Sequence, residues 1–308
     1  MEHTTATSRT DTALPGADRT RRWTGRLAGA ASLLMVCALS IPSAGAVQGD
    51  ARTSAEAALF VSDYGDNRVV TLPAAEDEQA TVPLDGVVRP TGLAWDAECD
   101  LYVSDTGDNR VVKLAADGTQ STVPAGDLSR PLGLAVDRGG NLFIADSFDN
   151  RVVRVTPDGR RSTLPTTGLL HPWGLALAGD GSLYVSDFIN NRVVKVAVDG
   201  SGQTTVPTVG LSQPTGLALN AGGDLYISDS GNDRVVKVAR RGGSQTTVPI
   251  TGLRGPLGLA VDGHKNLYVA DASHHRVVRV QESGERQTTV PLTGLNTPTG
   301  IVLPSPRR

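Results

Sequence analysis

The chain has 308 residues, a formal net charge of −3, 35 glycines, 18 prolines and only 4% aromatic residues. So many glycines and prolines leave little room for an uninterrupted helical period, which argues against an all-helical protein. Beyond residue 46 the net charge is about −5 and there is no basic stripe. The electrostatic footprint of phosphate binding is therefore missing, and we expect no nucleic acid as a partner.

The N-terminal segment, residues 1–46, is predicted to be a secretory signal. Arginines up to Arg26 precede an apolar run of 15 residues, 27–41, and small residues follow it up to Ala46. This order is typical of a signal peptide, and the run is shorter than the roughly 20 residues that span a bilayer. We expect cleavage after Ala46, so the protein would contact a membrane only if the segment stayed uncleaved. Residues 47–57 are small and polar and predict a linker.

A motif recurs six times from residue 62 onward: Ser-Asp or Ala-Asp, three variable residues, one polar residue, and Arg-Val-Val. Successive copies are 41 or 42 residues apart. That period is typical of four-stranded propeller blades or of paired-helix repeats. The aspartate and arginine of the six copies are Asp63 and Arg68, Asp105 and Arg110, Asp146 and Arg151, Asp187 and Arg192, Asp229 and Arg234, and Asp271 and Arg276.

The pattern within each unit favours strands. In the third unit, four short runs cover residues 131–136, 141–146, 151–155 and 161–165. Each run has the length of a strand, contains β-branched or aromatic residues, and is bounded by Gly, Asp, Asn or Pro. The Arg-Val-Val segments place apolar side chains on both faces of a strand, which suits a blade packed between two others.

The two ends of the chain predict how the ring closes. The first unit begins at its second strand, residues 58–63, and the chain ends with a lone first strand, residues 298–303. These halves complete one blade. We therefore predict an all-β fold: a six-bladed β-propeller of four-stranded antiparallel blades over residues 58–303, in which the C-terminal strand closes the first blade. Residues 304–308 form a C-terminal tail.

The repeated Pro-x-Gly-Leu-Ala, Asn-Leu-Tyr-Val, Arg-Val-Val-Lys-Val and Thr-Val-Pro segments together resemble NHL repeats. More narrowly, residues 245–256 and their equivalents are similar to the extracellular sensor domain of mycobacterial-type receptor serine/threonine kinases. The resemblance covers essentially all of residues 58–303 and implies a propeller. It leaves the function open, because NHL propellers serve as sensors, as protein-binding or RNA-binding modules and, in the amidating lyases, as zinc enzymes. The kinase motifs are absent from this chain, so it is not itself a kinase.

Each motif aspartate ends the second strand of its blade and each arginine begins the third, so the pair flanks one tight loop. There the carboxylate can accept loop N–H groups and pair with the guanidinium. Because the pairs recur in every blade, we assign all of them to stability, and we expect neither a metal nor another cofactor. The alternative is a ring of aspartates that holds a cation such as Ca²⁺.

Function is expected where the repeats differ. The loops between second and third strands and the linkers between blades share one face, which we call the loop face. Six of the twelve aromatic residues occupy one column of the second strands and are expected in the core, whereas four others lie in or beside the loop face. Aromatic anchors carry much of the energy of recognition, although these rings could instead form a small local core. The predicted ligand site comprises Tyr64, Phe148, His171, Trp173, Phe188 and Ile189.

Catalysis has little support in the sequence. The histidines beyond the signal segment are His171, His264, His274 and His275, and the repeat phase places His264 on the opposite face and the last two histidines two blades from His171. No serine or cysteine has a repeat-breaking histidine beside it that would mark a nucleophile. We therefore predict no catalytic residues.

These observations favour a monomeric, sensor-like propeller, secreted or at the cell surface. We expect it to bind an extracellular protein, peptide or cell-wall component through the loop face without catalysis. The alternative is a propeller lyase or hydrolase with a metal in the axial channel.

Overall fold

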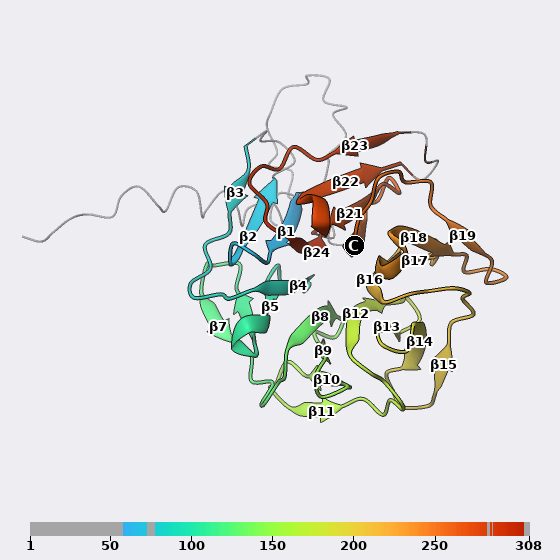
Figure 1. Cartoon of the computed structure of the whole chain (residues 1–308). Helices are drawn as coiled ribbons and strands as arrows, with labels where there is room; N and C mark the ends of the chain where they lie inside the picture. The colour runs from blue at the N-terminus through green and yellow to red at the C-terminus, as the bar shows by residue number, and fades with distance from the viewer. Residues whose placement is uncertain (1–57, 73–77, 282–283, 285, 305–308) are drawn as a thin grey trace, which may run out of the picture.

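The computed structural model describes residues 58–72, 78–281, 284 and 286–304. The predicted signal segment, the linker and most of the predicted tail lie outside these residues. In the described part, 24 strands form six four-stranded antiparallel sheets, which are arranged as blades around a central axis (Figure 1). The predicted all-β, six-bladed propeller is confirmed.

We number the blades in chain order and name their strands from the axis outward (Figure 1). Blade 1 consists of β24 (Pro298–Val302), β1 (Leu59–Asp63), β2 (Arg68–Leu72) and β3 (Ala80–Thr81). Blade 2 consists of β4 (Pro90–Trp95), β5 (Leu101–Asp105), β6 (Arg110–Leu114) and β7 (Gln120–Thr122). Blade 3 consists of β8 (Pro131–Val136), β9 (Leu142–Asp146), β10 (Arg151–Val155) and β11 (Arg161–Thr163). Blade 4 consists of β12 (Pro172–Leu177), β13 (Ser182–Asp187), β14 (Arg192–Ala197) and β15 (Gln203–Thr205). Blade 5 consists of β16 (Pro214–Leu219), β17 (Leu225–Asp229), β18 (Arg234–Val238) and β19 (Gln245–Thr247). Blade 6 consists of β20 (Pro256–Val261), β21 (Leu267–Asp271), β22 (Arg276–Val280) and β23 (Gln287–Thr289).

Short 3₁₀ helices follow the second strands of blades 2, 5 and 6: η1 (Thr106–Asp108), η2 (Ser230–Asn232) and η3 (Ala272–His274). Among the described residues, no helix has the length and apolar character needed to cross a membrane.

Both faces of each blade are buried against neighbouring blades. In β10, Val152 and Val153 point to opposite faces, and both are fully buried. Val152 packs in one cluster with Leu183 of blade 4, whereas Val153 packs in another with Tyr102 of blade 2. Six such clusters lie between the blades of the described chain. Burial on both sides explains why these strands carry consecutive apolar residues rather than an apolar-polar alternation.

The inner strands approach one another closely because each carries a glycine at its third residue. A Cβ on Gly258 of β20 would overlap the carbonyl oxygen of Thr299 in β24, and a Cβ on Gly300 of β24 would overlap that of Thr91 in β4. Only glycine permits this distance between backbones. The two contacts connect blade 6 to blade 1 and blade 1 to blade 2, so the ring is complete.

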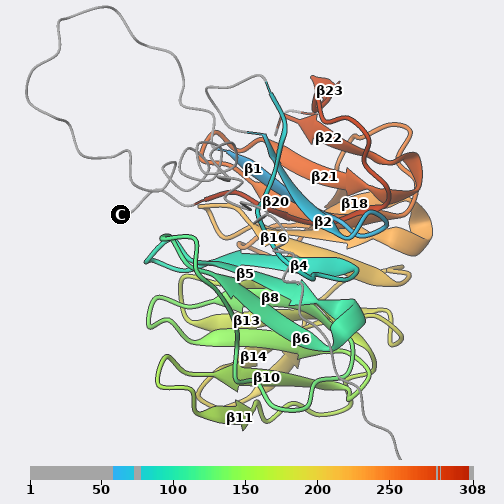
Figure 2. The ribbon, with the colours of Figure 1, turned by 90° about the vertical axis from the view of Figure 1, so that its left-hand side faces the viewer.

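The C-terminal strand closes blade 1, as predicted. β24 pairs antiparallel with β1, with Val302 opposite Phe60 and Ile301 opposite Val61. Figure 2 shows the ring from the side, with strands that run between its two faces. The loops between second and third strands lie on one face together with the linkers between blades, and the turns between first and second strands lie on the other.

Candidate functional site

The Asp-Arg pairs have the same geometry in all six blades. The arginine Nε donates to an aspartate oxygen at 2.6–2.8 Å, and every one of these aspartates is fully buried. In blade 3, the other oxygen of Asp146 accepts the backbone N–H of Ser129 at 2.6 Å, and Arg151 Nη2 donates to the carbonyl oxygen of Asp127 at 2.9 Å. Each pair therefore ties the loop after the second strand to the linker that enters the blade. The stabilising effect of the pairs stays a prediction.

Five of the six predicted ligand-site residues lie together at the junction of blades 3 and 4. The ring of Phe148, in the loop after β9, is 4.9 Å from the ring of His171, which lies in the linker that enters blade 4. The ring of Trp173, near the start of β12, is 5.2 Å from that of Phe188, directly after β13. Ile189 follows Phe188 in the same loop.

The same part of the surface gathers three of the four exposed large hydrophobic side chains of the described residues. Phe148, Leu170 and Ile189 are 46%, 41% and 49% exposed at the junction of blades 3 and 4. Val209 is 80% exposed but lies in the linker that enters blade 5, where its backbone bonds to the side chain of Gln245 in β19. Single exposed hydrophobic residues are ordinary, but their concentration in one place is typical of an interaction site. We call this surface the apolar sector, and it comprises Phe148, Leu170, His171, Trp173, Phe188 and Ile189.

Leu170 and Val209 were not predicted from the sequence. The carbonyl oxygen of Leu170 accepts the backbone N–H of Ile189 at 3.3 Å, so these two residues adjoin. The repeat holds a signal that could have found Val209, because the other linkers have a polar residue or glycine at its position. Those residues are Asp85, Gly126, Thr167, Thr251 and Thr293.

The Trp173–Phe188 pair is a departure of blade 4 from the repeat. In blade 2 the same two positions are Thr91 and Thr106, whose hydroxyl oxygens are 2.6 Å apart. Blade 5 has Thr and Ser there, with the same hydroxyl contact at 2.6 Å. Since two blades form the same structure with a pair of small hydroxyl residues, the fold does not require the two aromatic rings.

Tyr64 is separated from the apolar sector. It lies after β1 in blade 1, which is opposite blade 4 across the axis of the six-bladed ring (Figure 1). Its ring is half-buried and has the Arg89 guanidinium 5.9 Å from its centroid. The sequence indicates the correct face for Tyr64. Two residues on that face are neighbours only if their blades are adjacent, and blade 1 lies across the axis from blade 4.

Charged groups near the apolar sector are mostly paired. The Arg130 guanidinium lies 4.7 Å from the centroid of the Phe148 ring. Asp149, one of three carboxylates that the sequence places on the loop face of blades 1 to 3, is 3.0 Å from Arg151 Nη2. Its equivalents Asp66 and Asp108 are 3.5 and 3.7 Å from the arginines of their own blades. The carboxylates therefore belong to the Asp-Arg networks rather than to a separate anionic surface.

The histidines on the loop face serve three different contacts. The His171 ring contacts the Phe148 ring in a tilted arrangement in the apolar sector. His274 Nδ1 is 3.0 Å from the buried carboxylate of Asp271, and His275 Nδ1 accepts the backbone N–H of Thr297 at 3.0 Å. The described residues contain no group of three or more His, Cys, Asp or Glu side chains that could hold a metal ion.

The opposite face holds a cavity of about 1860 Å³ around the axis, lined in part by Trp95, Asp180, Tyr184 and Lys195. Tyr184 belongs to the aromatic column that we expected in the core, yet it is half-buried because it lines this cavity. A hydrogen bond from Lys195 Nζ at 2.9 Å lowers the pKa of Asp180 to about 2. Burial, by contrast, raises the pKa of Asp96 at the same face.

Solved structures with the same fold include both binding proteins and enzymes. A chain of the nidogen/laminin complex aligns with a TM-score of 0.72 and 23% identity, over 80% of this chain and 97% of that chain. A streptogramin B lyase aligns with a TM-score of 0.64 and 17% identity, over 80% and 84% of the two chains. A catalytically inactive variant of virginiamycin B lyase from Staphylococcus aureus with quinupristin aligns with a TM-score of 0.59 and 16% identity, over 78% and 86%.

At these identities the structural likeness shows a shared fold alone. No curated protein matches the chain. The family model of the virginiamycin B lyase family matches residues 38–305, which is most of the sequence. The chain therefore belongs to the virginiamycin B lyase family.

Proposed function

We propose that this protein is a non-catalytic binding module that takes an extracellular protein, peptide or cell-wall component at the apolar sector. The observation that carries the proposal is the concentration of exposed hydrophobic side chains and of two aromatic contacts at the junction of blades 3 and 4. The closed ring holds these loops in place before the ligand arrives. Binding to such a surface costs less conformational entropy than binding to a mobile one.

The arrangement of the rings has the features of an energetic anchor. Trp173 and Phe188 are half-buried and packed on each other, so a ligand group that covers them would complete their desolvation. Aromatic residues in such positions contribute most to interface energies. Arg130, next to the exposed Phe148 ring, adds a charged group to the rim, as interfaces commonly have. The ligand would present an apolar group to the rings and polar groups around it.

We also propose that the protein acts outside the cell in a sensor-like role. The order of arginines, apolar run and small residues in segment 1–46 supports export. The resemblance of the repeats to NHL sensor propellers supports the role. The loop face carries the residues that differ between blades, and ligand specificity is expected to reside in them.

A double variant tests the binding surface. Trp173→Thr with Phe188→Thr gives blade 4 the kind of pair that blade 2 has, so the fold should be kept. In capture from a cell-envelope extract, the parent should retain a partner that the double variant binds at least about tenfold more weakly, because each anchor contributes roughly 1–3 kcal/mol. Phe143→Ala in the core is the control for lost stability. If the double variant melts like the parent and captures the same partner equally well, the proposed surface is wrong.

A second candidate function, lyase activity, is favoured by one observation besides family membership. His274 is 44% exposed, and its Nδ1 is held at 3.0 Å by the fully buried Asp271. A neutral imidazole oriented in this way can take a proton through its other nitrogen. Two features point the other way: blades 4 and 5 have asparagine at this position with the same aspartate contact, and the described residues offer no donor set for a metal.

Activity can be tested on quinupristin, the ligand named with the related lyase. Incubation with the parent and with His274→Asn, followed by mass spectrometry, separates the two functions. The binding-module proposal expects no turnover by either protein. Turnover by the parent that is lost in His274→Asn would replace the binding module with an enzyme.

A further inference from the structure

One contact recurs at every joint between adjacent blades. In each loop face segment, the residue before the motif arginine has a left-handed backbone conformation, with φ between 52° and 55°. Its side chain accepts the backbone N–H of the residue that precedes the inner strand of the next blade. In the first five joints the donors and acceptors are Arg89 to Asn67, Arg130 to Asn109, His171 to Asn150, Gln213 to Asn191, and Gly255 to Asp233, at 2.7–2.8 Å.

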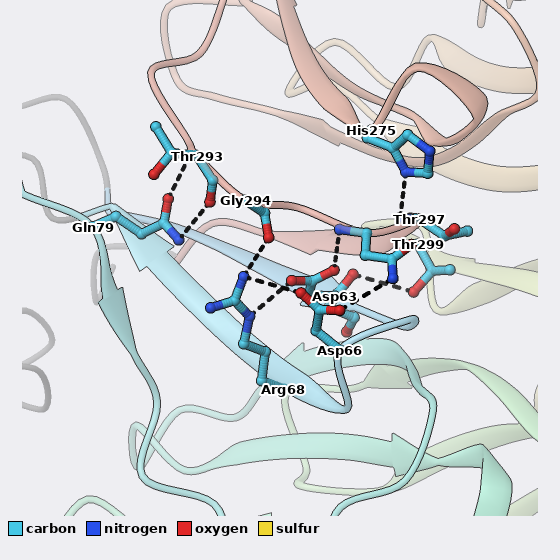
Figure 3. A network of polar contacts seen from close by, with 11 residues as sticks. Asp63, Asp66, Arg68, Gln79, His275, Thr293, Gly294, Thr297 and Thr299 are labelled. Atoms are coloured by element: carbon cyan, nitrogen blue, oxygen red, sulfur yellow. Dashed lines mark hydrogen bonds and ion pairs between the residues drawn. The ribbon is translucent and has the colours of Figure 1, made fainter.

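The sixth joint closes the ring, and its acceptor is a histidine. Thr297 N–H donates to His275 Nδ1 at 3.0 Å, immediately before β24 enters blade 1 (Figure 3). A backbone N–H can only donate, so this bond requires a lone pair on Nδ1 and a neutral imidazole ring. A protonated imidazole has N–H groups at both nitrogens and cannot accept. The closing joint is therefore the one whose hydrogen bond is lost when an imidazole takes up a proton.

The charged groups around His275 are those of its own loop and of blade 1. Asp271, His274 and Arg276 lie in its loop and strand, and Asp271 pairs with both of the other two. Figure 3 shows the groups across the joint, Asp63, Asp66 and Arg68, which hold the linker through Asn296 and Gly294. Carboxylates and guanidinium groups keep their charge in the pH range where imidazole titrates. The strand and linker of residues 290–302 contain no titratable side chain.

We propose that ring closure is sensitive to pH, with His275 as the switch. At neutral pH the neutral ring accepts from Thr297 and holds the entry of β24. When the pH falls and the ring takes up a proton, this bond is lost and β24 loosens from blade 1, while the amide acceptors of the first four joints are unchanged. An extracellular domain that meets acidic surroundings would open at this joint first.

His274, the neighbouring histidine, contacts another joint. Its Nδ1 is 3.0 Å from Asp271, whose carboxylate also accepts the N–H of Arg254 in the linker between blades 5 and 6 at 2.8 Å. The two adjacent histidines therefore belong to different joints, so the switch must be measured at the closing joint itself.

Hydrogen exchange of the propeller domain at about pH 7.5 and about pH 5, read as protection factors for single amides, tests the switch. The protection of Thr297 should fall about three- to tenfold at the lower pH, the range that loss of one hydrogen bond predicts. Gln213, whose acceptor is Asn191, is the internal control and should keep its protection.

His275→Asn gives the closing joint the acceptor of the first four joints and should make the protection of Thr297 independent of pH. His274→Asn should leave the pH dependence of Thr297 in place. Equal protection of Thr297 at both pH values in the parent, or an unchanged pH dependence in His275→Asn, would overturn the proposal. Neither result depends on whether the apolar sector binds a ligand.

Discussion

Asp146 illustrates what one residue of the repeat contributes. It is fully buried and accepts from Arg151 Nε at 2.7 Å and from the N–H of Ser129 at 2.6 Å. Asp146→Ala leaves both donors without this acceptor, so we expect the free energy of unfolding to fall by about 1–3 kcal/mol. Denaturant unfolding measures it, with the exposed Asp158→Ala as control. Unchanged stability together with loss of a bound cation would favour the alternative of an aspartate ring.

Asp180 gives a prediction about pH at the opposite face. The Lys195 ammonium lowers the pKa of this carboxyl from 3.8 to about 2. Because the pKa is lower in the folded state, the ionised carboxyl stabilises the fold at pH values above its ordinary pKa of 3.8. That contribution is lost as the pH falls from 3.8 toward 2. Carboxyl NMR titration should show the low pKa in the parent and a higher one in Lys195→Met. The same titration curve in both proteins would contradict the assignment to Lys195.

At the scale of strands and loops, the sequence predicts the regular elements well. The runs 131–136 and 151–155 have the bounds of β8 and β10. They were predictable because burial between blades demands consecutive apolar residues, whatever blade they belong to. The predicted run 161–165 extends two residues beyond β11 (Arg161–Thr163), and Pro165 at its end has no N–H to donate to a sheet.

The site was predictable only in part. Phe148, Trp173 and Phe188 break the repeat with aromatic rings in a chain that has few, so their positions are visible in the sequence. Leu170 is an ordinary aliphatic residue, and nothing in its type reveals that neighbouring loops leave it exposed. The exposure of Leu170 depends on what the next blade covers, and the pattern of the repeat does not contain that information.

The inner strands offer a test of how closely the blades approach. Gly300→Ala places a methyl group against the carbonyl oxygen of Thr91, which is backbone and cannot turn aside. We expect a loss of about 1–3 kcal/mol in the free energy of unfolding, as for other overpacked sites. Gly263→Ala is the matched control, because a Cβ there meets nothing within 4 Å. Equal stability of the two variants would show that the inner strands are farther apart.

The whole molecule depends on the closure of blade 1. Deletion of residues 297–308 removes β24, so β1 loses its inner partner and blade 6 loses a neighbour. The apolar cluster between blades 6 and 1, which includes Ile301, would then be open to water. We expect the truncated protein to lose its cooperative thermal transition. A cooperative melt within a few degrees of the parent would contradict this role of the C-terminal strand.

The central claim, that the apolar sector is the binding surface, is tested most directly by hydrogen exchange of the domain with and without the partner that the parent captures. Binding should slow exchange in residues 147–150, 170–173 and 188–191 and leave the turns of the opposite face, 96–100 and 262–266, unchanged. Protection confined to those opposite turns, or no protection in the three loop-face segments, would contradict the claim.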